Sequence, residues 1–132
     1  MFSVQDSEVS IQIMLIFKDL VIWQRSHKLT LEIYKATQLF PKEEVFGLTS
    51  QIRRAVSSIP TNIAEGCGRR TNAELANFLN IASGSASEVE YEILLAKEVG
   101  YITAEQCDTW TCEIGEIRSM LAAYMKKLKT EH

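Results

Sequence analysis

The chain has 132 residues, of which 46% are hydrophobic and 23% charged, and its formal net charge at pH 7 is −3. This length is sufficient for one domain whose core needs no disulfide or metal for support. The negative charge argues against a general nucleic-acid binder. Two prolines and six glycines leave too few turns for an all-β fold, so the composition favours an all-α protein.

Residues 1–16 contain Asp6 and Glu8 but no lysine or arginine, so the basic start of a signal peptide is missing. The apolar run over residues 11–17 is too short to span a membrane. We expect residues 1–16 to be a disordered or strand-like appendage to a helical-bundle domain over residues 17–132. An alternative translation start at Met14 would remove residues 1–13 and fits the sequence equally well.

The first helix is predicted over residues 20–40, with Asp19 as its N-cap and Pro41 just beyond its end. Two adjacent apolar lines follow helical spacing, one of Ile22, Leu29, Ile33 and Ala36 and the other of Trp23, His27, Leu31 and Tyr34. A surface this wide indicates contact with more than one neighbour.

The second helix is predicted over residues 47–65, with Gly66 and Gly68 as its stop. Its core-facing stripe is Leu48, Ile52, Ala55, Ile59 and Ile63. Pro60 lies inside this pattern, where a proline normally costs about 3 kcal/mol. We expect it to bend or split the helix near Ser57 and to serve a shape that the rest of the molecule needs.

The third helix is predicted from a capping box at Thr71 and Glu74 to residue 99, where Gly100 stops it. Its stripe is Leu75, Phe78, Leu79, Ala82, Val89 and Ile93. Residues 82–87 are all small, and Gly84 would cost about 1 kcal/mol relative to alanine. Close approach by another helix is the expected reason for this glycine.

The fourth helix is predicted from a second capping box, at Thr103 and Gln106, to residue 129. Its stripe is Cys107, Trp110, Ile114, Ile117, Leu121, Tyr124 and Leu128. Lysines 126, 127 and 129 fall in the last turn, where they complement the helix dipole. Four long helices with short links predict an antiparallel up-down four-helix bundle.

No catalytic, metal or cofactor site is predicted. Neither His27 nor His132 follows a glutamate by three residues, as a di-iron motif requires. Glu88 and Glu92 share a helix face, which we expect to be solvated or salt-bridged rather than metal-binding. Cys67, Cys107 and Cys112 contain no CxxC pair, so we expect reduced cytoplasmic thiols in apolar packing. An enzyme that uses Cys67 or these carboxylates is the least favoured hypothesis.

Charge differs sharply between the two middle helices. Residues 46–72 contain four arginines and one glutamate, a net of +3, whereas residues 73–109 contain one lysine and seven carboxylates, a net of −6. Arg53 and Arg54 project about 100° apart, so one is expected to pair with the acidic helix and the other to be solvated. The functional alternative is a phosphate-binding or inter-subunit surface, whose members would be Arg25, Lys28, Arg53, Arg54, Arg69 and Arg70.

Asn62, Glu65 and Arg69 follow one another at three- and four-residue steps beyond Pro60. One interpretation is local: Glu65 pairs with Arg69, and Asn62 satisfies backbone groups that Pro60 loosens. The other is a contact between subunits, and the two are compatible.

The segments FKDLVIWQ (17–24), QIRRAVSSIPTNIAEG (51–66), FLNIASGSASE (78–88) and GYI (100–102) closely resemble a bacterial four-helix-bundle family. Its members include proteins encoded in intervening sequences of 23S ribosomal RNA genes. The resemblance implies an up-down bundle that assembles as a ring-like homopentamer. Related accessory proteins of diversity-generating retroelements bind nucleic acid and a reverse transcriptase. The family's activity is poorly defined, so no catalytic residue is implied.

The leading hypothesis is therefore a non-enzymatic, homo-oligomeric bundle that binds or scaffolds structured RNA or a nucleic-acid enzyme. A local basic surface repeated around a ring can bind RNA even when the whole chain is acidic. The alternative is a protein–protein assembly module with no nucleic-acid partner. Neither hypothesis involves a membrane.

Overall fold

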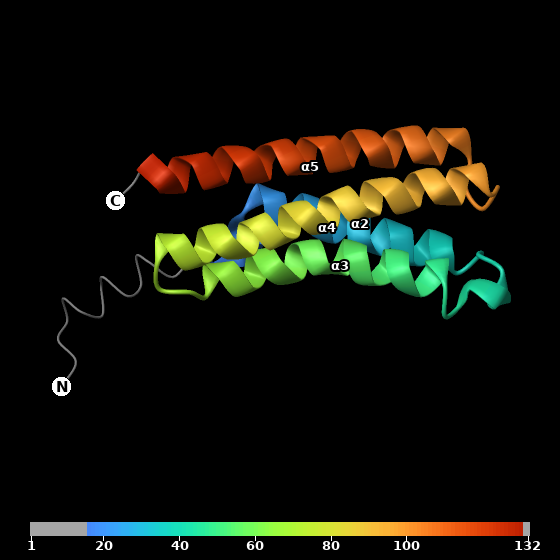
Figure 1. The fold of residues 1–132 in the computed structure, drawn as a ribbon, viewed down its shortest axis with the longest axis horizontal. Helices are drawn as coiled ribbons and strands as arrows, with labels where there is room; N and C mark the ends of the chain where they lie inside the picture. Colours follow the sequence, from blue (N-terminus) through green and yellow to red (C-terminus); the bar gives the residue numbers. More distant parts are fainter. Residues whose placement is uncertain (1–15, 131–132) are drawn as a thin grey trace.

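The computed structural model describes residues 16–130 as four long helices in an antiparallel up-down bundle (Figure 1). The helices are α2 (Val21–Thr37), α3 (Leu48–Cys67), α4 (Asn72–Glu98) and α5 (Ala104–Thr130). Single turns of 3₁₀ helix, Phe17–Asp19 and Lys42–Glu44, precede α2 and α3. The predicted all-α bundle is confirmed. The expected appendage lies outside the described residues apart from Ile16. No helix within residues 16–130 is both long and apolar enough to cross a membrane.

Two helix starts follow the predicted side-chain caps. The hydroxyl of Thr71 accepts a hydrogen bond from the backbone N–H of Glu74, and the hydroxyl of Thr103 accepts one from the N–H of Gln106. The turn between α4 and α5 places Gly100 at a φ of +88°, a conformation that glycine adopts without strain. The predicted caps and the predicted stop at this glycine are confirmed.

The ends of α2 differ from the prediction. Asp19 belongs to the preceding 3₁₀ turn, and Leu20 occupies the N-cap position with no side-chain hydrogen bond. At the other end α2 stops at Thr37, before the predicted residue 40. The chain then tightens into consecutive turns that run up to Pro41, the N-cap of the next 3₁₀ turn, as expected for residues just before a proline.

The predicted apolar stripes meet in one core. Ile33, Ile52, Ile93 and Ile114, one from each helix, are fully buried. α3 packs extensively along α4, and α4 along α5, whereas α2 meets α5 less closely. The second apolar line of α2 is only partly covered, since Trp23 and His27 are half-buried and Leu31 and Tyr34 are exposed.

α3 runs through Pro60 as one unbroken helix (Figure 1), so the predicted split near Ser57 is wrong and the bend stays a prediction. The carbonyl that loses its helical partner is that of Val56, four residues before the proline. It accepts a hydrogen bond of 3.2 Å from the buried hydroxyl of Thr30 on α2. The same hydroxyl lies 2.7 Å from the carbonyl of Ser26, so Thr30 replaces the missing helical bond only in part.

Close approach between helices occurs at Gly66 rather than at Gly84. A Cβ built on Gly66 would lie 2.8 Å from Leu75 Cδ1 and 3.0 Å from Phe78 Cβ on α4. Gly66 is therefore a packing glycine inside α3, whereas Gly68, the other glycine of the predicted stop, is the C-cap of the helix that ends at Cys67. A Cβ on Gly84 would meet no atom within 4 Å. The expectation that a helix of the same chain approaches Gly84 is wrong.

Candidate nucleic-acid interface

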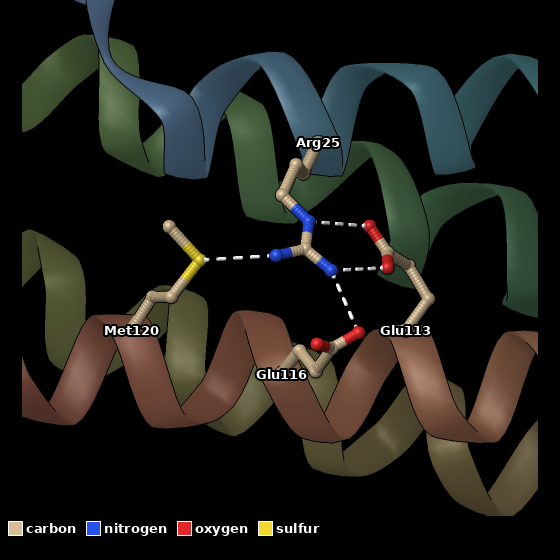
Figure 2. Close-up of polar contacts among 4 residues, drawn as sticks. All are labelled: Arg25, Glu113, Glu116 and Met120. Carbon is tan, nitrogen blue, oxygen red and sulfur yellow. Dashed lines mark hydrogen bonds and ion pairs between the residues drawn. The ribbon is translucent and has the colours of Figure 1, made fainter.

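Arg25 ties α2 to α5 (Figure 2). Its guanidinium donates to both carboxylate oxygens of Glu113, at 2.9 and 2.6 Å, and to Glu116 at 2.8 Å. Nη1 also lies 3.6 Å from the sulfur of Met120. The hydrogen bond to Glu113 raises the pKa of Arg25, and the same bond lowers the pKa of Glu113. Arg25 is therefore committed to a helix–helix contact.

Lys28 lies beside the same ion pair, in a groove of about 560 Å³ between α2 and α5. Glu32 also lines the groove, so two cations face three carboxylates there. A phosphate group would meet net negative charge in this groove. Arg25 and Lys28 are thus poorly placed to bind RNA.

Arg53 and Arg54 point to different neighbours, as their adjacent positions predict. Arg53 donates to Thr37 Oγ1 at 2.8 Å and to the carbonyl of Tyr34 at 3.1 Å, and its guanidinium lies over the Tyr34 ring. Arg54 is exposed and acts electrostatically on Glu92 of α4. Within residues 16–130 neither arginine forms an ion pair with α4, so the expected pairing is reduced to the electrostatic effect of Arg54 on Glu92, and Arg53 is bonded to α2 rather than solvated.

The carboxyl of Glu92 is buried, contrary to the expected solvated or salt-bridged face. Its side chain is 4% exposed, and Oε1 has no hydrogen-bond partner among the described residues. Burial raises the pKa of Glu92 to about 7, and the nearby carboxylate of Glu88 adds to the rise. The reason is geometric: Glu92 lies three residues after Val89 and four before Ala96, both of which are fully buried.

The local interpretation of the segment beyond Pro60 holds for Glu65 and Arg69 but not for Asn62, which bonds to Ser58 rather than to the Val56 carbonyl that Pro60 frees. Glu65 and Arg69 form an ion pair of 3.3 Å, and the guanidinium of Arg69 lies over the Phe78 ring. Asn62 donates to the carbonyl of Ser58 at 2.8 Å and to its hydroxyl at 2.9 Å. The contact between subunits stays a prediction.

The six basic candidates therefore do not form one surface. Arg69 and Arg70 lie at the turn between α3 and α4, at the end of the bundle where α5 also finishes (Figure 1). The three lysines near the end of α5, Lys126, Lys127 and Lys129, are exposed, and the last two lie in its last turn. Counting charge by helix did not reveal this grouping, whereas the antiparallel order of the helices would have brought the two segments to one end.

Charge is polarised along the bundle. At the end just described, which we call the basic end, residues 65–74 and 126–130 contain five basic and two acidic side chains, a net of +3. At the opposite end, residues 38–47 and 97–108 contain two lysines and five carboxylates, a net of −3. The basic end is the part of the described structure best suited to attract a polyanion.

No grouping in residues 16–130 resembles a metal or nucleophile site. Those residues contain no cluster of three or more His, Cys, Asp or Glu side chains that could hold a metal. Cys67 and Cys107 are buried as expected, but Cys112 is exposed. Burial raises the pKa of Cys67, which lowers its thiolate fraction and makes it a poor nucleophile.

The comparisons with known proteins agree with this fold. The family model described as 23S rRNA-intervening sequence protein matches residues 18–123. A crystal structure of a protein of unknown function from the S23 ribosomal protein family of Bacteroides thetaiotaomicron VPI-5482 is 31% identical in sequence. The match covers 80% of this chain and 96% of that chain, with a TM-score of 0.74. No curated protein matches the chain. The chain belongs to the 23S rRNA-intervening sequence protein family.

Proposed function

We propose that this chain forms a non-enzymatic homo-oligomer, a ring of five copies in the cytoplasm, that binds structured RNA or scaffolds a nucleic-acid enzyme such as a reverse transcriptase. The observation that supports RNA binding is the net charge of +3 at the basic end, against −3 at the opposite end. The ring is supported by the sequence resemblance to pentameric bundles.

In a ring, the charge difference between the two ends of each copy adds to that of its neighbours. If all copies point the same way along the ring axis, their basic ends lie on one face and their acidic ends on the other. Association with a polyanion depends on the local field rather than on total charge. A chain with a net charge of −3 can therefore present a strongly positive face to RNA.

Native mass measurement, with and without co-purifying RNA, tests both parts of the proposal. The ring predicts a discrete oligomer at micromolar concentration, and a monomer there would rule it out. RNA binding should be visible at about 50 mM salt and should weaken steeply towards about 200 mM. A protein that shifts no RNA at the lower salt concentration would rule out the RNA partner.

The alternative is a protein–protein assembly module, which exposed apolar side chains at the opposite end favour. Leu39 is 88% exposed and Phe46 is 94% exposed. A protein contact through such residues would depend little on salt. An oligomer that retains a protein partner at high salt and never binds RNA would support this alternative.

A further inference from the structure

A groove of about 640 Å³ runs between α4 and α5 at the basic end. Each wall consists of residues at helical steps of three and four. The α4 wall is Ala73, Ala76, Asn77 and Asn80, and the α5 wall is Ala122, Met125, Lys126 and Lys129. Three alanines leave the groove open where longer side chains would fill it.

The polar groups of this groove are uncommitted. Lys126 and Lys129 are exposed, and neither forms an ion pair with another described residue. The exposed side-chain amides of Asn77 and Asn80 make no hydrogen bond within residues 16–130. No carboxylate lines the groove. It thus differs from the groove beside Arg25, where the cations already face carboxylates.

The groove has a defined end along the α4–α5 surface. Arg118 of α5 reaches α4, where it pairs with Glu90 at 2.7 Å and donates to Ser87 at 3.2 Å. Beyond this bridge, the surface hollow between the same helices contains Glu90 and Asp108 with one lysine, Lys97. Net positive charge along the α4–α5 surface is therefore found in the half that belongs to the basic end.

We propose that the groove of Asn77, Asn80, Lys126 and Lys129 binds the sugar–phosphate backbone of RNA. This inference rests on the proposed function and names its contact site, which lies outside the six basic residues predicted from sequence. Lysine ammonium groups bind phosphate as point charges. Asparagine amides both donate and accept, so they can contact phosphate oxygens and ribose 2′-hydroxyls.

The test measures binding of a fluorescein-labelled RNA hairpin, with a stem of about 16 base pairs, to the full chain. Lys126→Gln combined with Lys129→Gln should lower the affinity at about 50 mM salt at least tenfold. It should also reduce the slope of log affinity against log salt by about two for each protomer in contact. Asn77→Asp, which adds a carboxylate and removes no lysine, should weaken binding as well.

The matched control is Lys35→Gln combined with Lys42→Gln, which makes the same change in charge at exposed lysines outside the groove. It should retain wild-type affinity, and all variants should show the wild-type helical spectrum. If both double variants weakened RNA binding equally, the effect would come from total charge, and the groove would not be the RNA-binding site. Unchanged RNA affinity in the Lys126/Lys129 variant would show that the groove does not bind RNA, without contradicting the proposed function.

Three further results separate the remaining explanations. If the wild-type chain binds no RNA at about 50 mM salt, the proposed function and the groove fail together. If polyglutamate binds more tightly than RNA and responds to the same variants, the groove binds acidic protein and the RNA assignment is overturned. If the groove variants change the native mass instead of RNA binding, the groove is a contact between copies and the proposal is wrong.

Discussion

The buried carboxyl of Glu92 predicts a pH dependence of stability. Burial and the neighbouring Glu88 carboxylate raise the pKa of Glu92 from 4.5 to about 7, and Arg54 opposes part of this rise. The folded protein therefore keeps the Glu92 proton up to about pH 7, whereas the unfolded chain releases it near pH 4.5. Stability is highest, as far as this group is concerned, below pH 4.5 and falls as the pH rises towards 7.

The magnitude follows from the change in pKa. A rise from 4.5 to about 7 corresponds to a loss of roughly 3 kcal/mol in the free energy of unfolding above pH 7, at 1.36 kcal/mol per unit. Between about pH 5 and pH 8 the expected loss is roughly 2 to 3 kcal/mol, because part of the unfolded population has already released its proton at the lower pH. The depressed pKa values of Glu44 and Glu113 act below this window, where they reduce stability as the pH falls.

Glu92→Gln removes the ionisable group and keeps the shape of the side chain. Urea unfolding at about pH 5 and pH 8 should show the wild-type loss of roughly 2 to 3 kcal/mol largely absent from the variant. The variant should be the more stable protein at the higher pH. All measurements need one protein concentration, since the proposed assembly would make apparent stability depend on concentration.

Glu98→Gln is the matched control, because Glu98 is exposed on the same helix. It should reproduce the wild-type pH profile. Parallel profiles for the wild type and Glu92→Gln would refute the reasoning, since they would mean that folding does not desolvate this carboxyl.

Thr30→Val should lower the free energy of unfolding by about 1 to 2 kcal/mol, because it removes the hydroxyl that reaches the carbonyl freed by Pro60. The loss should shrink in a Pro60→Ala background, as a double-mutant cycle would show. Gly66→Ala should cost about 1 to 3 kcal/mol by overpacking, whereas Gly84→Ala should stabilise the helix by up to about 1 kcal/mol in thermal unfolding. If Gly84→Ala instead disrupted the proposed oligomer, another copy would cover this position. Arg25→Met should cost about 1 to 2 kcal/mol in urea unfolding, and an unchanged midpoint would mean that solvent already screens its ion pairs.

The elements of the fold were predictable because their signals are local. Thr71 and Thr103 each precede a glutamate or glutamine by three residues, and both caps form. The core stripes follow from three- and four-residue spacing. The start of α2 has no such signal, because Leu20 caps it without a side-chain hydrogen bond. Asp19 was therefore a false cap.

Partners across helices were not predictable, since periodicity gives a residue's face but not its neighbour. Arg25 and Glu113 are separated by 88 positions in sequence, and nothing near either residue indicates the other. Glu92 is different: its spacing from Val89 and Ala96 placed it in the buried stripe, and only its charge indicated solvent. Helical spacing predicted the burial of Glu92 better than its charge did. Because the carboxyl is buried, its pKa is raised.

The basic end was missed for a third reason, which is how charge was counted. A count by helix assigns the lysines of α5 to a dipole effect and the arginines of the α3–α4 turn to a separate surface. In an antiparallel bundle, charges at the same end of the molecule act together. The α3–α4 turn and the end of α5 lie at one end (Figure 1). The same sequence therefore predicts different partners once the direction of each helix is taken into account.

Contacts within one copy of the chain explain how α3 accommodates Pro60. The proline removes one helical hydrogen bond, at a cost of about 3 kcal/mol in an ordinary helix. The hydroxyl of Thr30 recovers part of that cost at the carbonyl of Val56, and burial of the proline ring recovers more through the hydrophobic effect. If these two terms suffice, Pro60→Ala should leave the native mass of the proposed oligomer unchanged. A changed native mass would instead place Pro60 at the contact between copies proposed for Asn62, Glu65 and Arg69.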